Sequence, residues 1–278
     1  MSRSIIACAC LLSFCALCAT ARAQPNPPSG DWQLTLQGDY MYGAIDGYVQ
    51  VPSGGEPGTS SAKRPTFSEL GIDNASIYEV RFQAAWRDEQ FYGSGQFTRV
   101  SGSATLDQQL TTHGVTFPAG SQLSSDITLD WYEFGYRHRF SFGPDDRGRD
   151  QFTLLPSIGV AIFNFDYSTH ATAGASASRS YIKLTPQLGI ELDWRPSNGP
   201  FWLALQLEGS PPISPPLPLL YVEKLTANYQ LLHGRYGDLT IFAGIAFEQM
   251  FFEDNQTVPN KTRADIGPAG IFGLSFSF

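Results

Sequence analysis

The last seven residues of the chain alternate strictly between large apolar side chains and small ones. The apolar residues occupy every second position: Phe272, Leu274, Phe276 and Phe278, separated by Gly273, Ser275 and Ser277. A period of two belongs to a β-strand, because successive side chains point to opposite faces. An ordinary edge strand in water would leave these large apolar side chains exposed at a free terminus. The C-terminus therefore predicts a strand whose apolar face needs an apolar environment.

The same alternation recurs along most of the chain. In the segment 180–194, apolar residues from Ile182 to Trp194 face one way, whereas Lys183 and Asp193 face the other. We expect ten strands, at residues 31–43, 76–87, 90–101, 127–142, 151–167, 180–194, 201–210, 219–232, 239–252 and 265–278.

The connections between these strands alternate in length. The long ones are residues 44–75, 102–126, 168–179, 211–218 and 253–264, and the mostly short ones are 88–89, 143–150, 195–200 and 233–238. An even strand number with this asymmetry is typical of transmembrane barrels. No stretch after Ala23 is apolar for long enough to form a membrane-spanning helix, and a closed barrel is the other structure that can span. A soluble β-sandwich would also alternate, with its apolar face inside.

Two local features add expectations about strands and loops. Pro156 and Pro186 fall within neighbouring strands, nearly opposite one another, and each removes a ladder donor, so a bulge or a thinned ladder is expected there. In the first long connection, Thr66 is followed three residues later by Glu69, which resembles a helix capping box. A short helical turn folded over the barrel mouth and a mobile surface loop both remain open.

Residues 1–23 have the features of a cleaved secretion signal. Arg3 precedes an apolar run, and Ala21-Arg22-Ala23 forms a small-x-small cleavage site. All the cysteines lie in this segment (Cys8, Cys10, Cys15 and Cys18), so the mature chain is expected to form no disulfides. Cys18 lacks the usual lipoprotein residues before it. Removing Arg3 and Arg22 lowers Lys+Arg from 18 to 16 against 26 Asp+Glu, so the net charge changes from −8 to −10. An acidic exported chain is not expected to bind nucleic acid.

A chain that ends on an alternating aromatic strand with a final Phe resembles the outer-membrane β-barrels of Gram-negative bacteria. The resemblance covers the pattern from Asp31 to Phe278, after a lead-in at residues 24–30. It implies an all-β, ten-stranded antiparallel transmembrane barrel in the outer membrane, with long extracellular loops and short periplasmic turns. It also implies that Phe272, Leu274, Phe276 and Phe278 form the signal read by the barrel-assembly machinery. Membrane lipid and lipopolysaccharide are the expected surroundings, with aromatic girdles at both interfaces.

The faces expected to point into the lumen carry many opposite charges: Glu79, Arg81, Arg87, Glu133, Arg137, Arg139, Lys183, Glu191, Asp193, Glu208, Lys224 and Glu248. Charges beyond the reach of water must pair. Eight strands give an interior just filled by side chains, and ten lie close to that limit. We therefore predict a narrow or closed passage held by an ion-pair network, although small residues of the fifth and tenth strands could leave one side wet.

No catalytic motif, metal site or cofactor site stands out in the sequence. Asp166 and His170 are the nearest match to the acidic and histidine residues at the extracellular rim of the omptin proteases, which are ten-stranded barrels that this chain resembles in strand number. They lack a visible orienting partner, so ordinary polar loop residues are the alternative reading. Short acidic runs such as Glu253-Asp254 lack the spacing of a calcium loop.

Two classes of function follow from these observations. The first is a non-enzymatic outer-membrane protein: a small channel, an adhesin or an envelope-stabilising barrel. The alternative is an embedded hydrolase, such as an omptin-like protease or a lipid A-modifying enzyme, with its site at the extracellular rim. The missing motifs favour the first class.

Overall fold

The computed structural model describes residues 32–52, 64–143, 151–196, 199–212, 217–235 and 237–278. The expected secretion signal and lead-in therefore lie outside the described residues. The elements are β1 (Trp32–Gln50), η1 (Ser68–Leu70), β2 (Asn74–Trp86), β3 (Glu89–Thr105), β4 (Leu110–Thr112), β5 (Val115–Phe117), β6 (Gln122–His138), β7 (Phe140–Phe142), β8 (Gln151–Ala171), β9 (Ser176–Arg195), β10 (Phe201–Gly209), β11 (Leu219–Gly234), β12 (Gly237–Glu253) and β13 (Lys261–Ser277).

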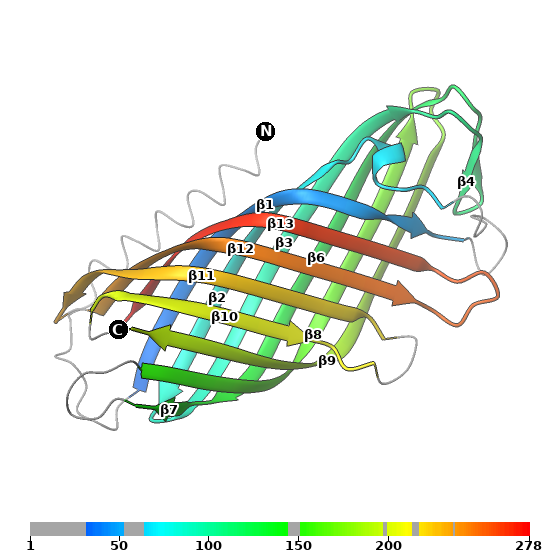
Figure 1. The fold of residues 1–278 in the computed structure, drawn as a ribbon. Helices are drawn as coiled ribbons and strands as arrows, with labels where there is room; N and C mark the ends of the chain where they lie inside the picture. The colour runs from blue at the N-terminus through cyan, green and yellow to red at the C-terminus, as the bar shows by residue number, and fades with distance from the viewer. Residues whose placement is uncertain (1–31, 53–63, 144–150, 197–198, 213–216, 236) are drawn as a thin grey trace.

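Eleven of these strands form one antiparallel sheet that closes on itself (Figure 1). Its order is β6-β3-β2-β1-β13-β12-β11-β10-β9-β8-β7, and β6 also pairs with β8. β6 and β7 continue one another past Arg139 and both pair with β8, so the barrel wall has ten strands. The predicted ten-stranded antiparallel barrel is confirmed.

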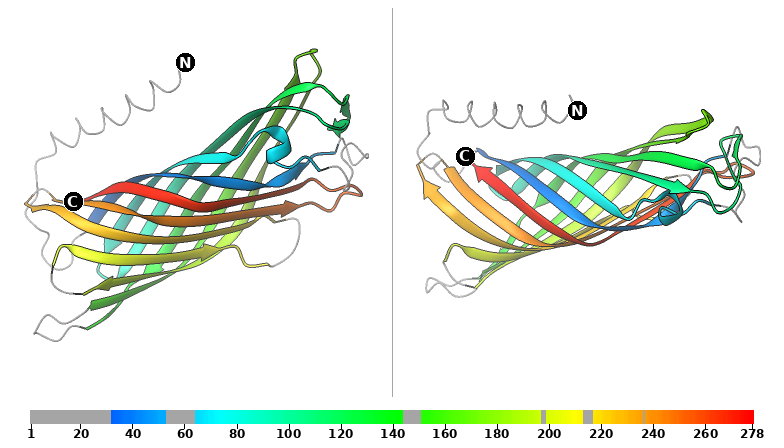
Figure 2. Two further views of the ribbon diagram at one scale, coloured as in Figure 1. Left: turned by 45° about the horizontal axis from the view of Figure 1, so that its top comes forward. Right: turned by 90° about the horizontal axis from the view of Figure 1, so that it is seen from above.

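The C-terminal strand closes the barrel by pairing with β1 on one side and β12 on the other. Backbone hydrogen bonds join Leu34 and Phe278 in both directions, at 2.9 and 2.8 Å. We call the end of the barrel that holds Trp32 and Phe278 the terminal end, and the opposite end the loop end. Figure 2 shows the strands running obliquely between these two ends.

The strands extend further toward the loop end than expected. β8 runs to Ala171 and β9 begins at Ser176, so the predicted third long loop, 168–179, is wrong and shrinks to a turn at 172–175. The small and hydroxylated residues of this stretch gave no apolar alternation. They nevertheless continue the ladder, with Ser168 opposite Ser178 and His170 opposite Ser176.

Of the two features expected near Pro156 and Pro186, the bulge is absent, because the β8–β9 register runs without a shift, and the thinned ladder is present beside Pro186. Pro186 pairs with Val160 and Pro156 with Ile190, so the two prolines are offset rather than opposite. β10 pairs with β9 only as far as Leu188. Among the described residues, the part of β9 that contains Pro186 is therefore a sheet edge on that side, where a missing donor is tolerated. The barrel does contain register shifts elsewhere, in β13 between Ile266 and Ala269 and in β11 between Gln230 and Leu232.

The first long connection folds into the barrel mouth. The backbone N–H of Glu69 donates to Thr66 Oγ1 at 3.1 Å, and that of Thr66 donates to Glu69 Oε2 at 2.8 Å, so the predicted capping box is present. It fixes the 3-10 turn η1, whose flanking residues Phe67, Leu70 and Ile72 are buried. The helical-turn interpretation is correct for residues 64–73.

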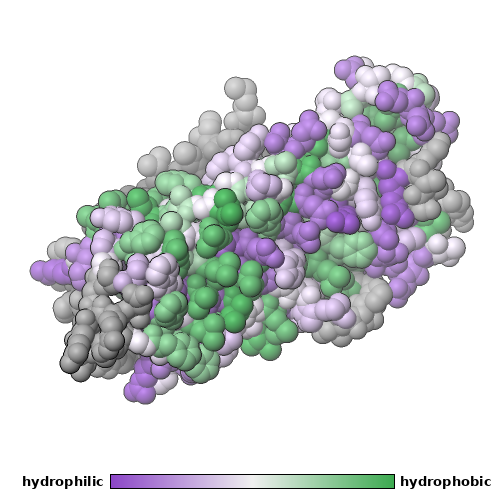
Figure 3. Space-filling view, in the orientation of Figure 1, coloured by the Kyte–Doolittle hydropathy of each residue, from purple (hydrophilic) through white to green (hydrophobic). Residues whose placement is uncertain are grey.

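The outer surface carries a belt of exposed apolar side chains, visible as green patches in Figure 3, and polar residues gather toward the loop end. The belt contains Val80, Phe82, Phe134, Ile158, Leu184, Leu188, Ile190, Leu192, Leu205, Leu225, Ile245, Phe247, Phe272 and Leu274. Exposed Trp32, Trp86, Phe201 and Phe278 border it at the terminal end. Apolar residues outside and charged residues inside are the reverse of a soluble sandwich. None of the described helices is long and apolar enough to cross a membrane.

Candidate functional site: the lumen

A layer of buried charges crosses the lumen in the terminal half of the barrel. Arg81 on β2 pairs with Glu79 of the same strand at 3.0 Å and reaches Glu208 on β10 at 3.8 Å. Lys224 on β11 donates to Glu79 from across the lumen. All four side chains are buried. Since isolated buried charges are unstable, this pairing is what allows the layer to exist.

Arg137 on β6 extends the same network. Its two terminal nitrogens donate to Glu208 at 2.5 Å and to Glu191 on β9 at 2.6 Å. Its guanidinium also lies over the ring of Tyr92, with 4.4 Å between the guanidinium carbon and the ring centroid. The chain of ion pairs thus links β11, β2, β10, β6 and β9, and it ties opposite walls of the barrel together.

Two further predicted residues lie in this layer. Glu133 is buried and interacts electrostatically with Glu208 as well as with Arg81 and Arg137. Glu248 accepts a hydrogen bond from Gln96 at 2.8 Å. Asp39, which the sequence reasoning missed, is also buried here and interacts electrostatically with Lys224. Every second residue of β1 faces the lumen, and Asp39 lies two residues from both Gln37 and Met41, so the alternation of this strand could have placed it inside.

The remaining predicted members lie outside the layer. Arg87 occupies the β2–β3 turn with a φ of 56°, and its guanidinium lies 4.7 Å from the ring centroid of Trp86. Lys183 lies over the ring of Phe252, nearer the loop end. Arg139 and Asp193 line a cavity nearer the terminal end.

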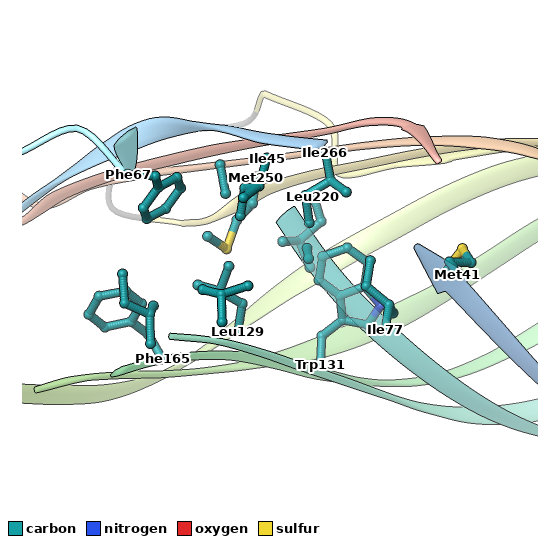
Figure 4. Close-up of a cluster of buried hydrophobic side chains, with 14 of the residues drawn as sticks. Met41, Ile45, Phe67, Ile77, Leu129, Trp131, Phe165, Leu220, Met250 and Ile266 are labelled. Carbon is teal, nitrogen blue, oxygen red and sulfur yellow. The ribbon is translucent and has the colours of Figure 1, made fainter. Parts of the chain in front are cut away.

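The loop half of the lumen is packed with apolar side chains. Figure 4 shows Phe67, Met250 and Leu220 pointing across the lumen toward Leu129, Trp131 and Phe165. All belong to one buried cluster. The cavity between Gln96 and Met250 measures only about 10 Å³, which holds about one water molecule. The sequence reasoning expected a polar lumen throughout and did not foresee this packing.

The terminal half contains a cavity of about 330 Å³, which we call the vestibule. Its lining is mostly polar: Gln33, Thr35, Gln37, Arg81, Gln83, Arg139, Glu191, Asp193, Arg195, Trp202, Ala204, Gln206, Lys224, Thr226, Asn228, Gln230, Asp238, Thr240, Phe242, Ile271, Ser275 and Ser277. Because Gln33 and Ser277 lie at strand ends, the vestibule opens at the terminal end. The charge layer closes its other side.

Asp166 and His170 lie on the outer face of β8, and both are exposed. They are four residues apart on one strand, so their α-carbons are roughly 13 Å apart. Asp166 is opposite Ser180, and His170 is opposite Ser124 and Ser176, in a polar outer surface made by β3, β6, β8 and β9. The fold does not bring this pair together.

The other histidines are also distributed over the barrel. His138 Nδ1 lies 3.2 Å from Glu89, and His233 Nδ1 lies 2.6 Å from Asp238. The acidic pair at 253–254 is engaged in its own turn, since Glu253 pairs with Lys261. In the part of the chain that the structure describes, no three His, Cys, Asp or Glu residues are grouped as a metal site.

The C-terminal residues lie as predicted on the outer face. Phe272 and Leu274 are exposed, and the rings of Phe276 and Phe278 lie 5.8 Å apart. Their recognition by the assembly machinery stays a prediction.

No family model and no curated protein matches the sequence. Similar solved structures include the outer membrane protease OmpT from Escherichia coli, with 10% identity, a TM-score of 0.42 and coverage of 94% of this chain and 100% of that one. Ail, the attachment invasion locus protein of Yersinia pestis, has 11% identity, a TM-score of 0.36 and coverage of 90% and 100%. Neisserial surface protein A has 10% identity, a TM-score of 0.31 and coverage of 88% and 97%. At these values the similarities transfer no function.

Proposed function

We propose that the protein is an integral outer-membrane barrel that acts as a surface protein, an adhesin or an envelope-stabilising element, and has no open diffusion pore. The observation that carries the proposal is the apolar packing across the loop half of the lumen, beside which a separate cavity of only about 10 Å³ lies. A through-channel would need a continuous polar path, and this packing interrupts it.

In this proposal the apolar belt lies in the bilayer and the terminal end faces the periplasm. The loop end projects outside, and the polar outer face of β3, β6, β8 and β9 meets lipopolysaccharide and external partners. Exposed serines dominate that face, together with Asp126 and Asp166. The proposal includes no catalysis by Asp166 and His170. A general base must lie within hydrogen-bond reach of its partner, and these two residues are too far apart on β8 to hydrogen-bond each other.

Planar-bilayer recording of the refolded protein tests the closed passage. Wild-type protein should give no steady conductance on the scale of a general porin. A matched variant, Phe67→Ser with Leu70→Ser, loosens the mouth, but the charge layer should still keep its conductance well below that of a porin. Steady porin-scale conductance of the wild type would overturn the proposal.

A lipid A mass profile of cells with and without the protein tests the alternative class of embedded hydrolases. The proposal predicts identical profiles. A protein-dependent loss of an acyl chain or phosphate, abolished by His170→Ala, would replace the surface-protein function with an enzymatic one.

A further inference from the structure

The vestibule has the size and the chemistry of a ligand site. Its volume of about 330 Å³ lies at the lower end of the roughly 300–1,000 Å³ typical of small-molecule pockets. A second cavity of about 240 Å³ shares four of its lining residues, Arg139, Asp193, Arg195 and Trp202. The space around these four residues is therefore larger than the first cavity alone.

The shared wall carries an excess of positive charge. Within the described residues, no ion pair at salt-bridge distance engages Arg139 or Arg195, whereas Arg81 and Lys224 at the inner end are neutralised by carboxylates. Asp193 interacts electrostatically with both arginines of the shared wall and also with Glu191, which pairs with Arg137. The four shared residues therefore contain two guanidinium groups and one carboxylate, which favours an anionic ligand, and guanidinium groups bind carboxylates in a two-pronged geometry.

One of the lining residues carries an unsatisfied polar atom. Asp193 Oδ1 is buried and has no hydrogen-bond partner among the described residues, whereas the side chain of Gln206 is hydrogen-bonded to Glu208. Leaving a buried acceptor unpaired is costly, so a ligand that supplies an O–H to Asp193 would be stabilised. A hydroxyl group meets this requirement.

The neutral part of the lining matches a sugar ring. Six carboxamides line the cavity: Gln33, Gln37, Gln83, Gln206, Asn228 and Gln230. The amide nitrogens of Gln37, Asn228 and Gln230 already donate to Asp39, Thr226 and His233. Gln33 and Gln83 can place a donor beside an acceptor, as neighbouring hydroxyls require. Trp202 supplies an aromatic surface, and Arg195 lies 4.7 Å from the centroid of its indole ring. This contact places the guanidinium over one face of the indole, so an apolar sugar face would rest against the rest of the Trp202 side chain.

We propose that the vestibule binds a small anionic saccharide, with its carboxylate held by Arg139 and Arg195 and its hydroxyls held by Asp193 and the surrounding carboxamides. The site goes beyond the proposed surface function. It does not depend on which end of the barrel faces the periplasm, so either proposal can fail without the other.

Calorimetric titration of the refolded full chain in detergent tests the site, with glucuronic acid, glucose and inorganic phosphate as probes. Glucuronic acid should bind, and glucose should bind roughly ten-fold more weakly or not at all because it lacks the carboxylate. Arg195→Gln should weaken glucuronic acid binding by roughly ten-fold or more. Lys261→Gln, at the loop end, should leave it unchanged.

A gel mobility that changes on boiling identifies folded variants, and Arg139→Gln serves as a second test if Arg195→Gln does not fold. Absence of glucuronic acid binding to the wild type would overturn the proposal. Equal affinity for phosphate and glucuronic acid would contradict recognition of the sugar, and equal loss in Lys261→Gln would contradict the location.

Discussion

The two halves of the barrel place their apolar and polar side chains on opposite faces of the wall. In the terminal half, apolar residues such as Leu188 and Phe272 cover the outside, and the inside holds the charge layer and the vestibule. In the loop half, Phe165 and Met250 are buried inside, while Asp126 and Ser178 are exposed outside. The loop half is arranged like a soluble β-structure and the terminal half like a membrane-embedded one.

Strands such as β8 pass through both arrangements without a break in alternation, whereas β13 contains the register shift between Ile266 and Ala269. On β8, Ser157 and Ala161 face inward in the terminal half, and Phe163 and Phe165 face inward in the loop half. The parity of the inward positions is unchanged, so only the chemistry has reversed. The solvent outside the wall, rather than the strand itself, decides which chemistry each face carries.

The level of this reversal marks the edge of the expected bilayer. On β1 it lies between Asp39 and Met41, and on β6 between Trp131 and Glu133. From Trp32 to Tyr42 the outward face of β1 contains aromatic, aliphatic and small residues, a stretch of 11 residues. A membrane-spanning strand needs about 9–11 residues. The terminal half alone is therefore long enough to span a bilayer.

Arg137→Ala is expected to have the largest effect on stability. It leaves Glu208 and Glu191 without their shared partner in the buried layer, and stripping one partner from a buried ion pair typically costs roughly 3–5 kcal/mol. Denaturant unfolding in detergent should report the loss. Lys261→Ala breaks the more exposed pair with Glu253 and should cost about 0–1 kcal/mol. Equal effects would mean that water reaches the layer freely.

Phe165→Ala tests whether the loop half is a packed core. Phe165 is fully buried, and its ring lies 4.6 Å from that of Tyr181 across the β8–β9 pair. Truncation of a buried Phe costs roughly 3–5 kcal/mol. Thr153→Ala, on the same strand beside the polar cavity, should change the free energy of unfolding by less than about 0.5 kcal/mol. A small effect of the Phe165 change would show a loosely filled interior.

Leu188→Arg compares the outer surfaces of the two halves on one strand. Leu188 lies in the apolar belt of β9, where an arginine should cost about 2–4 kcal/mol at the midplane of a bilayer. Ser178→Arg, on the outer face in the loop half, should cost almost nothing. Folding yield and stability in lipid vesicles measure both. Similar costs at the two positions would remove the distinction between the halves.

The barrel, its strand number and the charge layer could be predicted from the alternation of apolar and polar residues. The charged residues occupy the alternate positions of each strand that face the lumen. Glu79, Arg137 and Lys224 were found in this way. The apolar interior was missed because apolar residues were assigned to the outside along whole strands. Phe163 and Phe165 lie an even number of residues from Ser157 on β8, so they face the same side of the strand, and this spacing would have revealed the apolar interior.

Other features depend on contacts that no local pattern encodes. The apolar packing at the loop end includes Phe67 and Leu70, which belong to the first connection and not to a strand of the barrel wall. They reach the lumen because that connection folds over the barrel mouth. The vestibule depends on which inward charges pair across the lumen: Arg81 pairs with carboxylates, whereas among the described residues Arg139 and Arg195 have no carboxylate at salt-bridge distance. Alternation places these residues inside, but it cannot choose their partners.

Depth-dependent quenching of single-cysteine labels on β9 tests the reversal most directly. All native cysteines lie within the first 18 residues, which belong to the expected secretion signal. In a protein prepared without that segment, a cysteine introduced into the barrel is therefore the single site that a thiol label can modify. In vesicles that contain a quencher in the lipid tails, labels at Leu184, Leu188 and Leu192 should be quenched strongly, and a label at Ser178 should be quenched only by a water-soluble quencher. Lipid quenching at Ser178 equal to that at Leu188, or none at Leu188, would contradict a barrel whose terminal half alone lies in the membrane.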